Sequence, residues 1–217
     1  GVATVMNSFN EIGGVPATGS THLVRDILKG EWGFDGFVVS DWGSIGELVP
    51  HGFAADNKHA AQLSIVAGSD MDMESSVYVE HQVELVQSGQ VEEAVVDEAV
   101  RRILRVKHLL GLFDDPYRYS DVEREKRVVL RAEHLQASRD VARRSIVLLE
   151  NERDILTLDR ESGKIAVIGP LADDNDSPLG GWRAQAETDS AVSLLEGIRA
   201  AAGPGLEIRY AKGAALD

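Results

Sequence analysis

The stretch Phe37–Gly43, FVVSDWG, is an apolar run that ends in a carboxylate, an indole and a glycine. A short apolar run of this kind is typical of a buried strand in a parallel sheet. Parallel α/β folds place their active sites at the carboxyl ends of their strands. We therefore predict that Asp41 and Trp42 lie in a functional site at the end of a strand.

This pair of side chains suits sugar chemistry. An indole can pack on the apolar face of a pyranose, while a carboxylate attacks or stabilises an oxocarbenium-like carbon. Aspartate is also a frequent helix cap, so the residues alone leave a second interpretation open, in which Asp41 caps the next helix.

Two further apolar runs, Val2–Met6 and Ile65–Ser69, also lead into polar residues, and we predict a strand for each. Together with the helices between them they give the order β-α-β-α-β-α-α, which is typical of βα units around a parallel sheet. Helical spacing of apolar residues predicts four helices. The first runs from Ser20 or Thr21 to Gly30, and the second from Asp56 toward Val66. The third is marked by Val79, Val83 and Val86 and ends near Gly89, and the fourth is marked by Ala99, Ile103, Val106 and Leu110 and ends at Gly111.

The pattern changes after the first hundred residues and then restarts. Residues 116–163 are densely charged and are predicted to be a linker with a connecting helix from about Ala132 to Leu149. A buried strand is predicted at Lys164–Pro170 and a further strand at Glu207–Tyr210. Between them we expect a helix over residues 191–202 whose inward side chains are Leu194, Leu195 and Ile198. The predicted parts are therefore residues 1–115, 116–163 and 164–217.

Composition excludes several classes of function. The 36 acidic against 22 basic residues give a formal charge of -14, which repels phosphate backbones and disfavours nucleic-acid binding. The absence of cysteine excludes disulfides, thiolate zinc sites and cysteine nucleophiles. No stretch approaches the ~18 apolar residues of a membrane span. Because the chain starts at Gly1, directly on an apolar run, we expect it to be a piece of a longer protein.

Other parts of the sequence offer further candidate sites. Asp70, Asp72 and Glu74 could form a metal cluster, but the spacing lacks the glycine and third ligand of a calcium loop, so no metal is predicted. Neither a G-x-S-x-G nucleophile elbow nor a G-x-G-x-x-G nucleotide fingerprint is present. The polar segment 173–182 has two open interpretations, a loop that faces a cleft and an ordinary acidic surface loop.

The stretch Trp32–Gly43 resembles the nucleophile motif of glycoside hydrolase family 3. Details at His51–Asp56 and Tyr210–Ala214 are most similar to the branch of bacterial periplasmic β-glucosidases. Further segments agree with the family in the same order: Asn7–Asn10, Gly14–Thr18, Ala67–Met73, Gly111–Tyr117, Ala142–Asn151 and Ile165–Asp173.

The resemblance implies an α/β fold that comprises the C-terminal part of a (β/α)8-type barrel followed by the start of an α/β sandwich domain. Three strands cannot close an eight-stranded barrel, so a fragment is expected. An open barrel edge exposes unpaired strand groups and apolar surface. The expected partners are therefore a companion chain that carries the remainder of the enzyme and, as a second expectation, another copy of this chain in a homodimer.

The activity implied by the resemblance is that of a retaining β-glucosidase acting on terminal β-D-glucosyl residues of a β-glucoside or small oligosaccharide. Asp41 would be the nucleophile that forms a covalent glycosyl-aspartate, and Trp42 would wall the sugar site. Phe9 would line the sugar pocket, and Ser69 and Glu74 would neighbour it. This chemistry needs no metal and no cofactor.

Several alternatives remain within and outside this activity. A β-xylosidase, an exo-glucanase or an N-acetylglucosaminidase of the same family would share the motifs above, and a non-catalytic sugar-binding fragment is the alternative from another class. The general acid/base glutamate of the resembled branch is expected beyond Asp217. The resemblance further implies a periplasmic or secreted protein.

Overall fold

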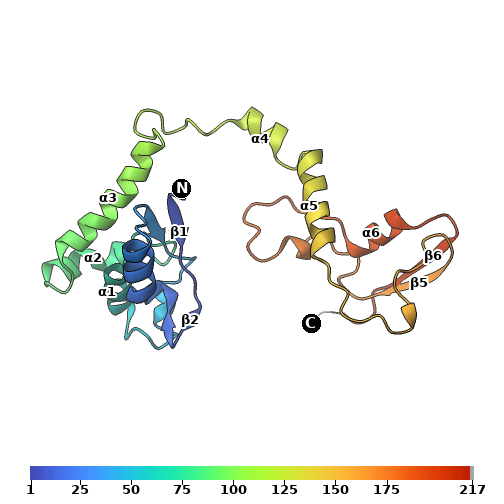
Figure 1. Cartoon of the computed structure of the whole chain (residues 1–217), viewed down its shortest axis with the longest axis horizontal. Helices are drawn as coiled ribbons and strands as arrows, with labels where there is room; N and C mark the ends of the chain where they lie inside the picture. Colours follow the sequence, from blue (N-terminus) through green and yellow to red (C-terminus); the bar gives the residue numbers. More distant parts are fainter. Residues whose placement is uncertain (216–217) are drawn as a thin grey trace. The chain divides into compact units, whose positions relative to one another are not determined.

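The computed structural model describes residues 1–215, which form two compact units, Gly1–Arg131 and the residues from Ala132 on (Figure 1). Unit 1 contains, in order, β1 (Thr4–Met6), β2 (Glu11–Ile12), β3 (Val15–Pro16), η1 (Ala17–Gly19), η2 (His22–Glu31), β4 (Phe37–Val39), η3 (Gly46–Leu48), α1 (Asn57–Ala67), α2 (Val77–Gln87), α3 (Glu93–Leu109) and α4 (Val122–Val128). Unit 2 contains α5 (Ala132–Ser145), η4 (Glu152–Asp154), β5 (Gly163–Ile168), η5 (Ser177–Leu179), α6 (Leu194–Ala201) and β6 (Leu206–Ala211).

The centre of unit 1 is a parallel pair of strands, β1 and β4, with Val5 opposite Val38. Val38 is fully buried, as expected for the middle of a strand with both faces covered. A third segment joins the edge of β4 through a single parallel bridge between Val39 and Met71. The predicted α/β fold with parallel strands is confirmed, and the described residues form an open arrangement rather than a closed barrel.

The strand predicted at Ile65–Ser69 is wrong. Helix α1 continues to Ala67, and Gly68 ends it in the left-handed conformation with φ 99°. Ile65 and Ala67 of this run lie on the buried face of the helix, whereas Val66 is 43% exposed. The strand-like bridge comes only at Met71. The predicted cap at the other end of α1 is confirmed, because the Asp56 carboxylate accepts a hydrogen bond of 2.8 Å from the His59 amide.

The core of unit 1 lies between α1, α2 and η3, and α1 packs directly against α2 (Figure 1). Helix α2 occurs where predicted, but Val79 and Val83 point to solvent. The helix is instead turned so that Val77, Tyr78 and Leu85 are buried. The residues of the core are Ile45, Leu48, Ala54, Ala60, Ala61, Ile65, Val77, Tyr78, Leu85, Val91 and Ala99.

Some helices differ from the prediction in their bounds, and one was not predicted. The helix predicted to stop at Gly30 is the π-helix η2, which continues to Glu31 and is preceded by a hydrogen bond of 3.3 Å from the Leu23 amide to the Ser20 hydroxyl. Helix α5 ends at Ser145 rather than Leu149. The charged segment before it, predicted only as a linker, forms the short helix α4.

Unit 2 has the predicted strand–helix–strand order, with β5 and β6 paired in parallel and α6 between them in sequence (Figure 1). Only Val167 of β5 is buried and Ile168 is 70% exposed, so the prediction of a buried strand is wrong. Among the described residues this sheet has two strands, and the small core beside it consists of Val167, Ala172 and Leu195. Leu195 is fully buried, whereas Leu194 is exposed, contrary to the prediction.

The boundary between the two units falls inside the predicted linker, at Arg131 and Ala132. The division of the chain at residues 115 and 163 stays a prediction. Within residues 1–215, the helices are too short or too polar to span a lipid bilayer.

Candidate active site

Asp41 lies two residues after β4, beyond the carboxyl end of the strand, and Trp42 begins the turn that follows it. The Asp41 carboxylate accepts a hydrogen bond of 2.7 Å from the Trp42 amide, and the indole is 52% exposed. The next helix, η3, is preceded by Ile45 and has no side-chain cap. The interpretation that Asp41 caps this helix is therefore wrong, and its half-buried carboxylate stands at a strand end beside an exposed aromatic ring.

A second segment runs alongside this turn and brings Glu74 to it. The Ser40 amide donates to the Met71 carbonyl at 2.8 Å, and the Gly43 amide donates to the Met73 carbonyl at 2.8 Å. The Met73 amide in turn donates to the Ser40 hydroxyl at 2.8 Å. Glu74 follows directly, exposed and with φ 75°, so its side chain is carried by a tightly held backbone next to the turn.

Phe9 reaches the same region from β1. The Asn7 amide donates to the Val39 carbonyl at 3.1 Å and so extends the pairing of β1 with β4 by one step. Because parallel strands end at the same edge of a sheet, the loops that carry Phe9 and Asp41 leave unit 1 at one edge. Phe9 is half-buried.

Ser69 is also part of this region, but it is fully buried. Its hydroxyl accepts a hydrogen bond of 2.7 Å from the Asn7 side chain and donates one of 2.9 Å to the Thr18 carbonyl. Asn7, Thr18 and Ser44 were not predicted as site residues. Their contacts join positions up to 62 residues apart, so no local spacing in the sequence could indicate them.

Asp70 and Asp72, two of the carboxylates that could form a metal cluster, have separate partners. Asp70 pairs with Lys29, and Asp72 accepts hydrogen bonds from the Ser75 hydroxyl and the Tyr78 amide. Among residues 1–215, no group of three or more histidine, aspartate and glutamate side chains is arranged to hold a metal ion. Glu74 is thus the member of this segment whose carboxylate remains on the surface.

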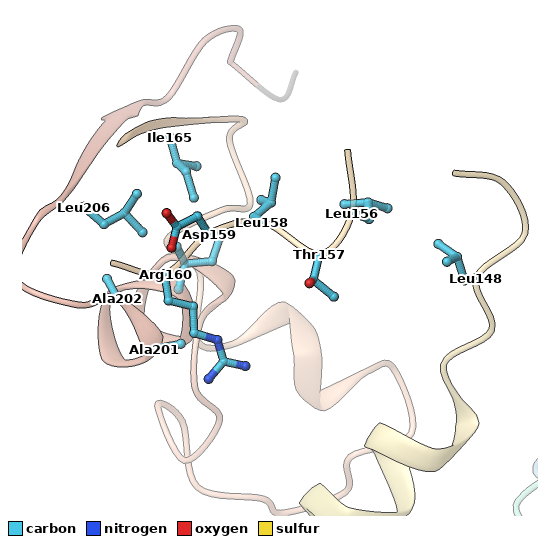
Figure 2. Close-up of a pocket in the computed structure, with 11 residues that line it drawn as sticks. Leu148, Leu156, Thr157, Leu158, Asp159, Arg160, Ile165, Ala201, Ala202 and Leu206 are labelled. Atoms are coloured by element: carbon cyan, nitrogen blue, oxygen red, sulfur yellow. The ribbon is translucent and has the colours of Figure 1, made fainter. Parts of the chain in front are cut away.

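A separate cavity of about 500 Å³ lies in unit 2 (Figure 2). Its wall is mostly aliphatic and contains none of the predicted site residues, so it lacks the carboxylate and aromatic pair that sugar hydrolysis requires. The residues that line it are Leu148, Leu156, Thr157, Leu158, Asp159, Arg160, Ile165, Ile198, Ala201, Ala202 and Leu206.

The acidic loop of unit 2 follows β5, and Asp173, Asp174 and Asp176 line a second cavity of about 400 Å³. The Asp174 carboxylate accepts hydrogen bonds from the Ser177 hydroxyl and amide and from the Asp176 amide, which lower its pKa. Trp182 is 74% exposed. These bonds are internal to the loop, and a role beside the active site stays a prediction.

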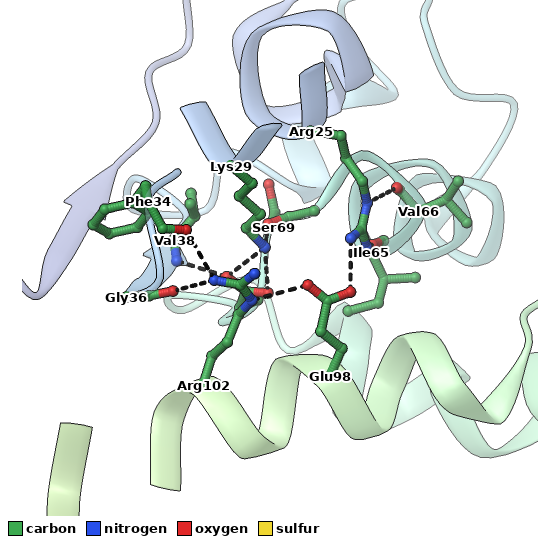
Figure 3. A network of polar contacts seen from close by, with 12 residues as sticks. Arg25, Lys29, Phe34, Gly36, Val38, Ile65, Val66, Ser69, Glu98 and Arg102 are labelled. Atoms are coloured by element: carbon green, nitrogen blue, oxygen red, sulfur yellow. Dashed lines mark hydrogen bonds and ion pairs between the residues drawn. The ribbon is translucent and has the colours of Figure 1, made fainter. Parts of the chain in front are cut away.

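A buried ion pair between Lys29 and Asp70 contacts β4, the strand that precedes Asp41 in the sequence (Figure 3). The Lys29 ammonium donates to both Asp70 carboxylate oxygens, at 2.7 and 2.9 Å, and the Val38 amide donates to the same carboxylate at 2.7 Å. Burial lowers the pKa of Lys29, although the hydrogen bond to Asp70 acts in the opposite direction. The Asp70 carboxylate thus binds the Val38 amide of β4, a group that would otherwise bond to the carbonyl of a neighbouring strand.

Glu98 of α3 forms two further ion pairs close to this one. Glu98 binds Arg25 at 2.8 Å and Arg102 at 2.9 Å. The Arg102 guanidinium also donates to the carbonyls of Phe34 and Gly36, just before β4 (Figure 3). Partial burial raises the pKa of Glu98, but the hydrogen bonds from the two arginines outweigh it and leave the pKa below its ordinary value.

Comparison with known proteins identifies both parts of the chain. The model of the glycosyl hydrolase family 3 N terminal domain matches residues 1–106, and that of the glycosyl hydrolase family 3 C-terminal domain matches residues 146–215. A periplasmic β-glucosidase of Salmonella typhimurium is 43% identical over 217 residues, covering 99% of this chain and 28% of the relative.

Two further relatives agree. A β-xylosidase of Formosa agariphila is 34% identical over 100% of this chain and 32% of its own length. The crystal structure of a β-glucosidase from Listeria innocua in complex with glucose matches with 38% identity and a TM-score of 0.76, over 98% of this chain and 29% of that one. This chain therefore spans less than a third of each of these relatives. With both domain models matched in order, the chain belongs to glycoside hydrolase family 3.

Proposed function

We propose that this chain carries the nucleophile of a retaining β-glucosidase. The observation that supports this most directly is the half-buried Asp41 carboxylate at the end of β4, beside the exposed Trp42 indole. In a retaining mechanism a carboxylate attacks the anomeric carbon while a second carboxylic acid, about 5–5.5 Å away, protonates the leaving oxygen. Asp41 takes the first of these roles in the proposal.

The proposed reaction runs in two displacement steps. An Asp41 oxygen forms a bond to the anomeric carbon as the glycosidic bond breaks, and the aglycone leaves with a proton from the general acid. Water, deprotonated by the same residue acting as a base, then displaces the sugar and restores the Asp41 carboxylate. We propose that the remainder of the enzyme, on the same or on a companion chain, supplies this acid/base.

The neighbouring side chains have distinct roles in the proposal. Trp42 packs against an apolar face of the sugar, Phe9 lines the pocket from β1, and Glu74 accepts sugar hydroxyl groups at its rim. Ser69 has no exposed surface, so we assign it a supporting role through Asn7 rather than direct contact with the sugar. No metal or cofactor takes part in the proposed reaction.

The substrate proposed is a terminal β-D-glucosyl residue of a β-glucoside or short oligosaccharide. The Listeria innocua protein has been crystallised with glucose and, as a mutant, with laminaribiose, which supports this choice. β-Xylosidase activity is the second candidate, because the Formosa agariphila relative of that name matches the whole of this chain. The name of the Salmonella typhimurium relative supports a periplasmic or secreted location.

The test compares the full-length protein containing this chain with its Asp41→Asn variant on nitrophenyl β-glucoside, β-xyloside and N-acetylglucosaminide. We expect the glucoside to be the best substrate and the variant to lose about 10³-fold or more in kcat. Asp35→Asn is the matched control, because Asp35 stands before the other end of β4 and pairs with Arg105 on the surface. Turnover that survives in Asp41→Asn contradicts the assignment, and sugar binding without turnover in the unaltered protein indicates a non-catalytic module.

A further inference from the structure

We propose that Thr18 is a positioning residue that holds together the three loops of the candidate active site. This inference deepens the proposed function and rests on it for its catalytic consequence. Thr18 lies in η1 and is 1% exposed, so its hydroxyl cannot contact a substrate directly. Its effect on the reaction must therefore pass through its neighbours.

Thr18 belongs to a closed ring of hydrogen bonds with Asn7 and Ser69. The Thr18 hydroxyl lies 3.1 Å from the Asn7 side-chain oxygen, and the Asn7 side-chain nitrogen donates to the Ser69 hydroxyl at 2.7 Å. The Ser69 hydroxyl then donates to the Thr18 carbonyl at 2.9 Å. At each contact in this ring one group is the donor and the other is the acceptor. The ring therefore fixes the orientation of the Asn7 amide.

Ser44 links this ring to the proposed nucleophile. The Ser44 hydroxyl lies 3.0 Å from the Thr18 hydroxyl, and both side chains are buried. The Ser44 amide donates to the Asp41 carbonyl at 3.1 Å, which closes the turn that holds the proposed nucleophile. The Thr18 hydroxyl has a single hydrogen and faces acceptors on Asn7, Ser8 and Ser44, of which only the Ser44 hydroxyl can also act as a donor.

Thr18 and Ser69 also contact the other two loops. The Thr18 hydroxyl is 3.2 Å from the Ser8 carbonyl, the residue immediately before Phe9. The Ser69 carbonyl accepts a hydrogen bond of 2.7 Å from the Tyr78 hydroxyl, and Glu74 lies on the segment between these two residues. Burial raises the pKa of Tyr78, so this phenol stays a donor.

The three loops that carry Phe9, Asp41 and Glu74 thus share one buried contact point. Among residues 1–215, no buried side-chain polar atom is left without a hydrogen-bond partner, so the network is complete. A complete buried network defines one arrangement, and removal of a central hydroxyl leaves neighbouring groups unsatisfied. Small displacements of a nucleophile are costly to the rate even when substrate still binds.

The experiment compares Thr18→Val, Thr18→Ser and Thr21→Val in the full-length protein. Valine keeps the shape of threonine but removes the hydroxyl, whereas serine keeps the hydroxyl. Thr21 is a matched control, because it is exposed and makes no side-chain cap contact. We expect Thr18→Val to lower kcat by about 10- to 100-fold with little change in KM. Thr18→Ser should restore kcat to within about threefold of the unaltered protein, and Thr21→Val should match it.

Amide hydrogen exchange gives a readout that does not depend on catalysis. Thr18→Val should speed exchange in residues 7–10, 41–45 and 70–75 together, without a matching change in α3. Unchanged exchange in these loops, or an unchanged kcat in a folded Thr18→Val protein, overturns the proposal. An unaltered protein without glycosidase activity would contradict the proposed function, while the exchange data would still decide the role of Thr18.

A variant that fails to fold also leaves a decisive measurement. In that case Ser44→Ala removes only the link to the Asp41 turn, and its exchange should rise in residues 41–45 while kcat falls. Unchanged exchange and unchanged kcat in Ser44→Ala would then overturn the inference.

Discussion

The Lys29 ammonium lies 2.7 Å from the Asp70 carboxylate, and both side chains are almost completely buried, with 5% and 2% of their surface exposed. Asp70 also contacts Val38 twice, because its carboxylate accepts from the Val38 amide and its own amide donates to the Val38 carbonyl at 2.8 Å. The pair therefore connects η2 to the middle of β4, three residues before Asp41. The stability of unit 1 and the position of the Asp41 turn therefore both depend on the Lys29–Asp70 pair.

Removing the cation of this pair should destabilise the fold. Lys29→Met leaves the Asp70 carboxylate buried without its counter-charge, which costs about 3–5 kcal/mol of unfolding free energy. Urea denaturation measures this loss. The matched control is Lys58→Met, whose lysine pairs with Glu84 in a more exposed position, so its cost should stay below about 1 kcal/mol. A Lys29→Met protein no less stable than the control would contradict the structural role of the buried pair.

Acid should weaken unit 1 through Glu98. Its pKa is lower in the folded state than in the unfolded chain, so its stabilisation is present above the unfolded pKa of about 4.3 and is lost as the pH falls through the folded pKa. Below about pH 4.3, the unfolded pKa, the free energy of unfolding of the unaltered protein should therefore fall more steeply with decreasing pH than that of Glu98→Gln. Thermal unfolding at a series of pH values measures the slopes. Glu93→Gln, an exposed change on the same helix, should keep the steep slope, and equal slopes in all three proteins would refute the assignment.

Two glycine-to-alanine changes should have opposite effects. A Cβ at Gly36 would lie 2.1 Å from the Ala3 carbonyl oxygen, so Gly36→Ala must push β1 away from β4 and should cost about 1–3 kcal/mol or more. A Cβ at Gly197 in α6 meets no atom within 4 Å, and Gly197→Ala should stabilise the helix by about 0.5–1 kcal/mol. Calorimetry of both variants checks the signs. A stabilising Gly36→Ala would show that β1 does not pair closely with β4.

The indole of Trp42 should contribute to sugar binding rather than to folding. Trp42→Ala removes the proposed aromatic wall and should raise KM for nitrophenyl β-glucoside about tenfold, with an unchanged melting temperature. Trp32→Ala is the control, because Trp32 is 71% exposed and follows η2. Equal KM values for the two variants would remove Trp42 from the proposed sugar site.

The end of β4 was predictable from local sequence, because the apolar residues Phe37–Val39 are followed by the polar residues Ser40 and Asp41 and no distant information is needed to end the strand there. The error at Ile65–Ser69 has a physical cause. A short apolar run fits a strand and the last turn of a buried helix equally well, and the run ends in Gly68, which caps α1 in the left-handed conformation. The predicted buried face of α2 was wrong for a related reason. Valines at helical spacing indicate one face of the helix, but tertiary packing buries the face that carries Tyr78 and Leu85.

The contacts that organise the candidate site were not predictable in the same way. Asn7, Thr18, Ser44 and Ser69 are short polar residues that are common in loops, and each is ordinary where it stands in the sequence. Only the parallel pairing of β1 with β4 and the path of the segment after α1 bring them together. Long-range hydrogen bonds of this kind depend on the complete fold, which local patterns do not encode.

The central claim is that Asp41 is the catalytic nucleophile, and a mechanism-based label tests it most directly. The full-length protein is incubated with dinitrophenyl 2-deoxy-2-fluoro-β-glucoside, whose leaving group needs no protonation and whose fluorine slows release of the covalent sugar. Intact-mass analysis followed by peptide mapping then locates the label. We predict one fluoroglucosyl group per chain, on Asp41, and none in Asp41→Asn. A label on another residue, or none in a protein that hydrolyses nitrophenyl β-glucoside, would contradict the claim.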